Sequence, residues 1–379
     1  MKKNGFKHLT AIVLAGGMAE RMGVCKVLLP LNGVSALEQI TMRMRAAGVG
    51  DIVVVTGARE KEVRREAARL GCRAEFNPAF KSGMYSSVLS GVRALPDDVS
   101  SFFLLPADIP LVKTATYAAL INAFNESSTY ADILYPTFRG DRGHPALIGR
   151  AMITSILNWH GESGMRGLLA AYAHSYRDVP TGDRSVLLDM DTPEDYAFMR
   201  EYAEFELFPD ADECEELLEI AETPERVVRH ARAVTRNGLK IASAVMKHGK
   251  RLDMRLVVSA CMLHDLAKGQ KYHEAKGASW LRKRGYAKVA KIVASHKDLP
   301  DRRNIGEAEI LYLTDKVTDG EEVSTLENRM KRMEARFQKN SNAAAQARRR
   351  INRAISIRGR VEEITGLSLA AILSESSLN

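Results

Sequence analysis

Histidine and aspartate residues that can bind metal ions recur through the second half of this 379-residue chain. An adjacent pair, His264-Asp265, ends an apolar helical run from Leu256 to Leu263. Burying these two polar side chains is costly unless they are paired or bound to a metal. Further candidate ligands lie before and after the pair: His230, His273, His296 and Asp315. Mixed imidazole and carboxylate ligands suit Mn²⁺, Fe, Co²⁺, Ni²⁺ or Mg²⁺.

A second group of residues, in the first half of the chain, is suited to binding phosphate. The segment from Leu14 to Lys26 reads LAGGMAERMGVCK and follows a predicted strand. Gly16 and Gly17 let the backbone approach a ligand, and successive backbone N–H groups can then surround a phosphate. Arg21 and Lys26 add positive charge, Arg21 as a bidentate donor and Lys26 as a point charge. The spacing matches neither the P-loop nor the dinucleotide-binding glycine pattern.

The elements that must position these residues alternate between strands and helices over the first ~200 residues. Short apolar runs predict four strands, and a helix is expected between the first two, at 35–47; the runs are 9–14, 52–57, 102–108 and 133–135. Continuous apolar strands interleaved with helices indicate an α/β fold, a Rossmann-like, mostly parallel sheet with helices on both faces. Ligands of such sheets bind beyond the carboxyl ends of the strands. Gly16 and Asp108 both follow strands at that edge.

The character of the sequence changes around residues 200–222. This stretch is acidic and contains Pro209, and after it the strand signals give way to helical periodicity. We therefore expect a first domain at 1–204, an acidic linker at 205–222 and an all-α second domain at 223–379 with basic C-terminal helices.

Composition and charge narrow the class of protein. Of the formal charge of +8, residues 331–360 carry ten basic residues and one acid, so the remainder is nearly neutral. This distribution favours a solvated helix face near phosphate-handling sites over a nucleic-acid-binding protein. No apolar run approaches the ~20 residues of a membrane span, and the N-terminus lacks a signal-peptide pattern. The four cysteines form no close pair, which fits reduced thiols in the cytoplasm.

The phosphate-binding segment resembles the MobA-like NTP transferases of molybdenum-cofactor maturation, whose signature is LA(G/A)GxxxRMGxxK. Five further segments are similar to motifs of this family in the same order: 77–87, 106–110, 142–145, 161–166 and 189–196. The resemblance covers nearly all of residues 8–200 and implies transfer of a nucleotidyl group with release of pyrophosphate.

The resemblance also implies roles for individual residues. Arg21, Lys26 and Asp108 would be catalytic, and Asp108 and Asp191 would hold Mg²⁺. His144 and Arg166 would bind the second substrate. The nucleotide would contact Leu14, Ala15, Gly16, Gly17, Arg21, Lys26, Gly83 and Ser87. Taken alone, Asp108 is better explained as a turn aspartate and Asp191 as a helix N-cap, and His144 is equally a structural turn histidine.

The base and the acceptor stay open on the residues alone. The segments 83–87, 142–145 and 161–166 resemble the CTP-using branch, which makes molybdopterin cytosine dinucleotide. The first loop reads LAGG, which is typical of the GTP-using branch, and Glu162 stands where the pattern usually has Asp. We favour CTP. A sugar or alditol phosphate is the alternative acceptor, and a nucleotide-sensing regulatory protein with an inactive domain is the alternative to an enzyme.

The second half resembles the HD-domain metal-dependent phosphohydrolases, whose pattern is H…HD…D on helices. His230, His264, Asp265 and Asp315 map onto this motif, which implies one divalent metal with Asp265 as a catalytic ligand. His273 and His296 match the additional histidines that some HD families use for a second metal. Lys268 would contact phosphate or cap the helix end.

Together these observations predict a bifunctional cytoplasmic enzyme. Its partners would be an NTP and molybdopterin, with a molybdoenzyme or its chaperone as the protein that receives the product. The substrate of the HD domain is open among a nucleotide, a pyrophosphate bond and a phosphorylated pterin.

Overall fold

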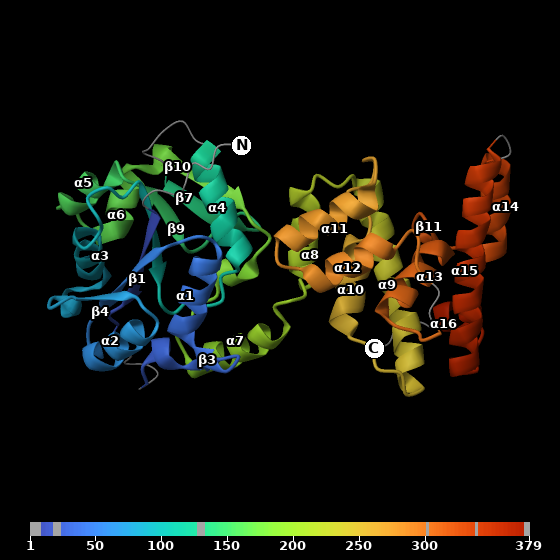
Figure 1. The fold of residues 1–379 in the computed structure, drawn as a ribbon, viewed down its shortest axis with the longest axis horizontal. Helices are drawn as coiled ribbons and strands as arrows, with labels where there is room; N and C mark the ends of the chain where they lie inside the picture. Colours follow the sequence, from blue (N-terminus) through green and yellow to red (C-terminus); the bar gives the residue numbers. More distant parts are fainter. Residues whose placement is uncertain (1–8, 18–23, 127–132, 301–302, 338–339, 375–379) are drawn as a thin grey trace. The chain divides into compact units, whose positions relative to one another are not determined.

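The structure is a computed structural model that describes residues 9–17, 24–126, 133–300, 303–337 and 340–374. The chain divides into two compact units between Glu206 and Leu207. Each unit has its own buried core, and each is described by itself below (Figure 1).

The first unit is built on one sheet with the strand order β10-β7-β9-β6-β1-β4-β5. Neighbouring strands are parallel except where β9 pairs with β6 and β7, and where the short β8 pairs with β7. The mostly parallel sheet expected from the apolar runs is therefore confirmed. The strands are β1 (Leu9–Ala15), β4 (Asp51–Thr56), β5 (Arg73–Phe76), β6 (Ser101–Pro106), β7 (Ile133–Phe138), β8 (Asp141–Arg142), β9 (Ala146–Gly149) and β10 (Tyr176–Pro180).

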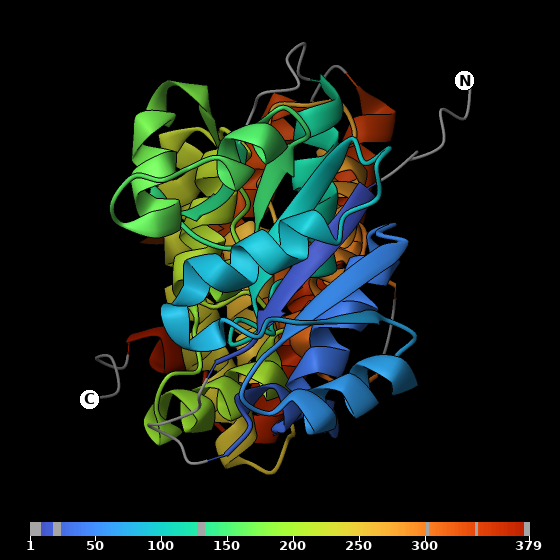
Figure 2. The ribbon, with the colours of Figure 1, turned by 90° about the vertical axis from the view of Figure 1, so that its left-hand side faces the viewer.

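Helices cover both faces of this sheet (Figures 1 and 2). Successive side chains of a strand point to opposite faces, so Ala11 and Val13 of β1 enter one core while Ile12 enters the other. The first core contains side chains of α1 (Ala36–Ala46), α2 (Glu60–Arg69) and α4 (Thr114–Glu126). The second contains side chains of α3 (Met84–Arg93), α5 (Met152–Leu157) and α6 (Gly164–Ala171). Helix α7 (Pro193–Phe205) packs on a smaller cluster with Leu31 and Leu111.

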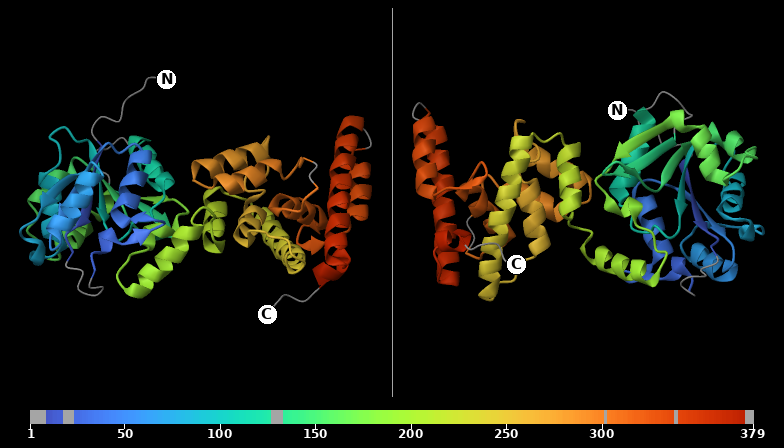
Figure 3. Two further views of the ribbon diagram at one scale, coloured as in Figure 1. Left: turned by 60° about the horizontal axis from the view of Figure 1, so that its bottom comes forward. Right: turned by 180° about the vertical axis from the view of Figure 1, so that it is seen from behind.

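The second unit is helical, as its periodicity predicts (Figure 3). Its helices are α8 (Ala211–Ile220), α9 (Glu225–Lys247), α10 (Met254–Leu263), α11 (His273–Lys283), α12 (Ala287–Ser295), α13 (Glu307–Val317), α14 (Leu326–Arg336), α15 (Ser341–Thr365) and α16 (Leu369–Ser374). A short hairpin of β11 (Thr318–Asp319) and β12 (Glu322–Val323) follows α13 and departs from the expected all-helical pattern. No helix in the described part of the chain is long and apolar enough to cross a membrane.

Residues 205–222 do not form the expected acidic linker. Asp210 caps α8 by accepting a hydrogen bond from the backbone N–H of Glu213. Cys214, Leu217 and Leu218 then lie on one buried face of this helix, in the core of the second unit. The second unit therefore begins at Leu207 rather than at residue 223. The prediction failed because the acidic composition of this stretch conceals the amphipathic spacing of α8.

Candidate functional sites

The glycine segment after β1 meets two other segments at the carboxyl edge of the sheet. A side chain at Gly57, which follows β4, would place its Cβ 2.4 Å from the carbonyl oxygen of Gly16. A Cβ at Gly16 would lie 3.2 Å from Ser87 Oγ, in the first turns of α3. The backbone of this segment can therefore approach its neighbours only because both positions are glycine. Gly16 and Ser87, predicted to bind nucleotide, are thus brought together.

Buried Asn77 supports this junction. Its side-chain amide donates to Ser86 Oγ (2.8 Å) and Ser87 Oγ (3.0 Å). Gly83 immediately precedes α3 with φ of 94°, a backbone conformation that favours glycine. The structure therefore gives the segment around Gly83 and Ser87 a fixed position beside Gly16. Sequence reasoning missed Asn77 and Gly57 as contributors.

The remaining predicted nucleotide-binding residues differ in which of their atoms can contact a ligand. The side chains of Leu14 and Ala15 belong to the two cores of the sheet, so only their backbones can face a ligand. Gly17 is exposed. Arg21 lies outside the described residues.

A lysine and two aspartates meet next to this edge. Lys26 Nζ lies 2.8 Å from Asp191 Oδ1. The backbone N–H of Met190 donates to the carbonyl oxygen of Asp108 (3.0 Å), which holds the segment of Asp191 against the end of β6. Burial raises the pKa of Asp108; Lys26 opposes this shift, and Asp191 and Asp189 add to it. A partly buried carboxylate beside two others favours a divalent cation, so these residues fit Mg²⁺. Asp189 was not singled out by sequence reasoning.

His144 lies close to residues 183–191, the segment that carries Asp189 and Asp191. Its backbone N–H donates to the carbonyl oxygen of Val186, and its Nδ1 is buried without a hydrogen-bond partner among the described residues. Burial lowers the pKa of His144, while Asp189 opposes the shift. His144 therefore lies near Asp189 with a buried Nδ1 that is unpaired among the described residues.

Arg166 differs from the other predicted substrate-binding residues. It is exposed on α6, and its guanidinium has no polar contact with any described residue. Gly164 of the same segment packs against Tyr85 of α3, where a Cβ would lie 3.0 Å from Tyr85 Cβ. Gly164 therefore packs α6 against α3, and the Arg166 side chain faces solvent.

The segment 183–191 is anchored by a buried ion pair between Lys113 and Asp183, which sequence reasoning missed. Asp183 is 2% exposed and accepts from Lys113 Nζ (3.0 Å), the Lys113 backbone N–H (2.9 Å) and Thr116 Oγ1 (2.6 Å). Burial alone would raise the pKa of Asp183, but Lys113 and the hydroxyl donors outweigh it and lower the pKa. Asp183 also accepts from the backbone N–H of Ser185 and so fixes the chain that leads to Asp189 and Asp191.

The change Asp183→Asn is expected to destabilise the first unit by about 3 kcal/mol, because it removes the buried carboxylate charge that pairs with the Lys113 ammonium. Chemical denaturation near pH 7 measures this loss. A group with a lowered folded pKa contributes stability above its unfolded pKa and loses it as the pH falls through the folded pKa. The difference between wild type and variant should therefore shrink in acid, and a constant difference would contradict the role given to the charge.

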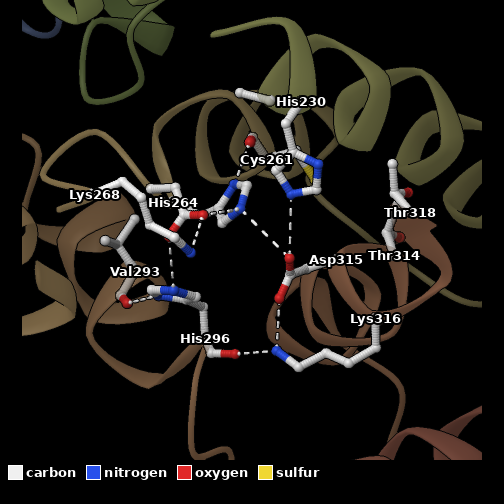
Figure 4. A network of polar contacts seen from close by, with 12 residues as sticks. His230, Cys261, His264, Lys268, Val293, His296, Thr314, Asp315, Lys316 and Thr318 are labelled. Carbon is white, nitrogen blue, oxygen red and sulfur yellow. Dashed lines mark hydrogen bonds and ion pairs between the residues drawn. The ribbon is translucent and has the colours of Figure 1, made fainter. Parts of the chain in front are cut away.

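The predicted metal ligands of the second unit converge from five helices. His230 lies on α9 and Asp315 on α13; His264 and Asp265 directly follow α10, His273 opens α11, and His296 follows α12. Figure 4 shows His230, His264, His296 and Asp315 directed toward a common space. The structure therefore brings together the residues that the resemblance to HD domains groups as metal ligands.

Backbone carbonyls orient three of the imidazoles. Nδ1 of His230 lies 2.8 Å from the carbonyl oxygen of Gly320, and Nδ1 of His264 lies 2.8 Å from that of Cys261. Nδ1 of His296 lies 2.7 Å from the carbonyl oxygen of Val293. A carbonyl oxygen only accepts, so each Nδ1 carries the hydrogen and each Nε2 keeps a lone pair. Gly320 lies in the β11–β12 turn, so this unpredicted hairpin positions His230.

The Asp265 carboxylate lies between two groups of ligands. Its Oδ2 is 3.4 Å from His264 Nε2, and its Oδ1 is 3.2 Å from His273 Nε2 and 3.4 Å from His296 Nε2. One group is His230, His264 and Asp265; the other is Asp265, His273 and His296, and within each the ligand atoms lie within 4.8 Å of one another. Asp315 Oδ1 lies 3.4 Å from His230 Nε2. Asp265 is thus placed to bridge two ions.

Two buried polar atoms at this centre lack a hydrogen-bond partner in the described chain. These atoms are His264 Nε2 and Asp265 Oδ1. Burial alone would raise the pKa of Asp265, but His264, His273 and His296 outweigh it and lower the pKa. Unpaired buried ligand atoms are costly, and a cation removes that cost. The residues therefore fit divalent metal ions.

Two lysines lie against the carboxylates of the centre. Lys268 Nζ is 2.8 Å from Asp265 Oδ2, and Lys316 Nζ is 2.7 Å from Asp315 Oδ2. Lys316 also donates to the carbonyl oxygen of His296 (2.8 Å). The contact of Lys268 with a metal ligand places it at the centre and goes beyond a helix-capping role.

Comparisons with known proteins agree with both halves. Residues 11–177 match the MobA-like NTP transferase domain, and residues 227–320 match the HD domain. Molybdenum cofactor cytidylyltransferase of Escherichia coli (strain K12) is 24% identical over 194 residues, which cover 51% of this chain and 96% of that protein. Molybdenum cofactor guanylyltransferase of Xanthomonas euvesicatoria pv. vesicatoria (strain 85-10) is 33% identical over 112 residues, 30% of this chain and 53% of that protein. Nicotine blue oxidoreductase of Paenarthrobacter nicotinovorans is 27% identical over 192 residues, 49% of this chain and 93% of that protein.

Proposed function

Since this chain joins a MobA-like NTP transferase domain to an HD domain, we propose that it is a two-site enzyme of molybdenum-cofactor metabolism. The first unit transfers a nucleotidyl group, preferably from CTP, to molybdopterin and releases pyrophosphate. The second unit is a metal-dependent phosphohydrolase. A molybdoenzyme or its chaperone would receive the nucleotide form of the cofactor.

The observation that carries the transferase proposal is the meeting of Lys26, Asp108 and Asp191 beside the Gly16 backbone. Nucleotidyl transfer is an in-line attack on the α-phosphorus, and the protein mainly positions the reactants and neutralises charge. Backbone N–H groups near Gly16 and the Lys26 ammonium would bind the triphosphate. Asp108 and Asp191 would hold Mg²⁺, which would neutralise the charge that develops on pyrophosphate. Arg21 and Arg166 are proposed as further contacts.

The choice of CTP is tested by competition. CTP and GTP are supplied together with Mg²⁺ and molybdopterin, and the two dinucleotide products are separated by chromatography. We expect the cytidine product to exceed the guanosine product by about tenfold or more, the range that one set of base contacts can supply. An excess of the guanosine product would assign the first unit to GTP.

The change Lys26→Ala is expected to weaken transfer by about 1.5–3 kcal/mol in kcat/KM, because it removes a charge-assisted phosphate contact. The ion pair between Lys26 and Asp191 is partly exposed, and such pairs contribute little to stability. Loss of Lys26 should therefore leave folding largely unchanged. Steady-state kinetics measures the effect. Lys61→Ala, an exposed lysine on α2, is the matched control. Unchanged kinetics in Lys26→Ala would remove this lysine from the site.

The observation that carries the hydrolase proposal is the Asp265 carboxylate between two histidine groups. Two divalent ions at such a site supply an activated water and charge stabilisation at the phosphoryl group. His230, His264 and Asp265 would hold one ion and Asp265, His273 and His296 the other, with Asp315 completing the first. Elemental analysis tests this assignment: two equivalents of metal per chain are expected, and one equivalent would restrict the site to a single ion.

A further inference from the structure

A cavity of about 150 Å³ adjoins the metal ligands of the second unit. His273, His296 and Asp315 line one side of it. Arg329 and Met333 of α14 and Arg350 and Ile351 of α15 line another side. Both helices lie beyond residues 227–320, which match the HD domain, and they run side by side in Figure 3. The wall of the cavity is therefore completed by an extension, α14 and α15, that lies outside the matched HD domain.

This extension is tied directly to the ligand-bearing helices. Arg329 Nη1 donates to three carbonyl oxygens at the end of α13: those of Asp315 (2.7 Å), Lys316 (3.1 Å) and Thr318 (3.1 Å). Helix α14 is thus fixed to the helix that carries Asp315.

Helix α15 is fixed to the same helix and to the segment after His296. Arg350 forms a two-point ion pair with Asp298, with both N···O distances 2.8 Å. The hydroxyl of Tyr312 on α13 donates to the carbonyl oxygen of Arg350 (3.2 Å). The two helices therefore close the cavity with a defined geometry.

The charge of the lining favours a compact polyanion. Five of the lining side chains are cationic, whereas Asp315 is the one acidic side chain of the described lining. These cations face acids outside the lining as well: Lys268 contacts Asp265, Lys297 lies 3.5 Å from Glu274, and Arg350 pairs with Asp298. Lys268 and Lys297 keep 43% and 39% of their side chains exposed, so both retain donors for a ligand. Clustered cations in a cleft attract phosphate anions.

The size and lining of the cavity favour a compact anion over a nucleoside. Its volume of about 150 Å³ is below the ~300–1,000 Å³ of pockets for drug-sized ligands. Proteins commonly hold a nucleobase by stacking it on an aromatic ring. Within the described lining there is no Phe, Tyr or Trp, and the apolar part is formed by Met333 and Ile351.

We propose that the HD centre hydrolyses inorganic diphosphate and that α14 and α15 restrict it to compact phosphate anions. The inference rests on the proposed function, because diphosphate is the leaving group of the transfer assigned to the first unit. A water oxygen bonds to one phosphorus and the bridging P–O bond breaks, with the electron pair going to the departing phosphate. Each of the two product phosphates carries one of the water protons. Removing diphosphate makes nucleotidyl transfer effectively irreversible by mass action.

Binding of methylenediphosphonate, a diphosphate analogue with a carbon bridge, tests the inference without turnover. The measurement is titration calorimetry on the full chain loaded with Mn²⁺, in a Lys26→Ala background that weakens binding at the first unit. We expect the analogue to bind about tenfold or more tightly than CMP. Arg350→Gln should weaken analogue binding by about tenfold, while Arg349→Gln, the neighbouring exposed arginine of the same helix, should leave it unchanged.

A second variant tests the wall itself. Met333→Ala removes apolar bulk from the cavity and should strengthen CMP binding by about fivefold, with little change for the analogue. Elemental analysis of each sample distinguishes a wrong substrate assignment from a missing metal centre. Equal binding of CMP and analogue by metal-loaded protein, or an unchanged Met333→Ala variant, would overturn the diphosphate assignment and leave the phosphohydrolase standing. Absence of metal would overturn both.

Discussion

Replacing Asp265 with alanine is expected to empty both metal positions of the second unit at once. The two Asp265 oxygens face different histidine groups, so a single substitution removes a ligand from each. Changes to outer-shell partners already cost about 10–100-fold in metal affinity, and loss of a shared ligand should cost more. Metal content by elemental analysis should fall to a small fraction of the wild-type value, and phosphohydrolase activity should be lost. Nucleotidyl transfer should persist, because no ligand of the first unit is touched.

The control for this variant is Glu363→Ala, an exposed acid of α15 outside both ligand groups and the cavity lining. Circular dichroism should show that Asp265→Ala remains folded, and Asp265→Asn repeats the test with the shape of the side chain retained. Full metal occupancy in Asp265→Ala would show that the centre is not built as described. Loss of transfer in a folded variant would show that the two units share one composite site.

The change Asp108→Asn is expected to lower the Mg²⁺-dependent rate of transfer by about a thousandfold, or ~4 kcal/mol in the barrier. The substitution keeps the shape of the side chain but removes one of the two carboxylates available to the ion. Burial raises the pKa of Asp108, so ionising this group opposes folding at neutral pH. Metal-free Asp108→Asn should therefore unfold at a temperature no lower than that of the wild type.

Asp97→Asn, an exposed aspartate before β6, is the matched control for this second variant. Titration of CTP with and without Mg²⁺ measures how far each protein depends on the ion. An identical Mg²⁺ dependence in Asp108→Asn and wild type would place the metal elsewhere, on Asp191 or on a residue outside the described segments.

Local sequence patterns were sufficient to predict four of the eight strands of the sheet, β1, β4, β6 and β7. The runs that became β1, β4 and β6 are apolar at consecutive positions because both faces of the sheet are buried, and Ala11, Ile12 and Val13 of β1 show this directly. The division between two fold classes was predicted for the same reason. Helix α8 was missed because its acidic residues outweigh Cys214, Leu217 and Leu218 in composition, although not in spacing.

The candidate sites were predictable where the residue type itself carries the chemistry. The histidines and aspartates of the second unit are such residues, because imidazole and carboxylate groups can bind a metal ion in any fold that brings them together. The sequence could not predict which Asp265 oxygen faces which group, because that depends on the packing of α10 against α11 and α12.

Supporting residues were not predictable because their role depends on distant neighbours. Asp183 is separated by 70 residues from Lys113, the residue that holds its charge. Arg350 looked like a member of a solvated basic helix, yet both it and Arg329 are held by polar groups close to the metal ligands. Sequence periodicity identifies the buried face of a helix, but the partner of an individual arginine is set by tertiary structure.

The central claim, that this chain is a two-site enzyme of molybdenum-cofactor metabolism, is tested most directly by the product of the first unit. The full chain is incubated with Mg²⁺, CTP and molybdopterin, and the products are identified by mass spectrometry. The account predicts a species in which cytidine monophosphate is joined to the phosphate of molybdopterin, and predicts its loss in Lys26→Ala and Asp108→Asn. Absence of any joined species with CTP or GTP, in a folded protein that binds the nucleotide, would contradict the account.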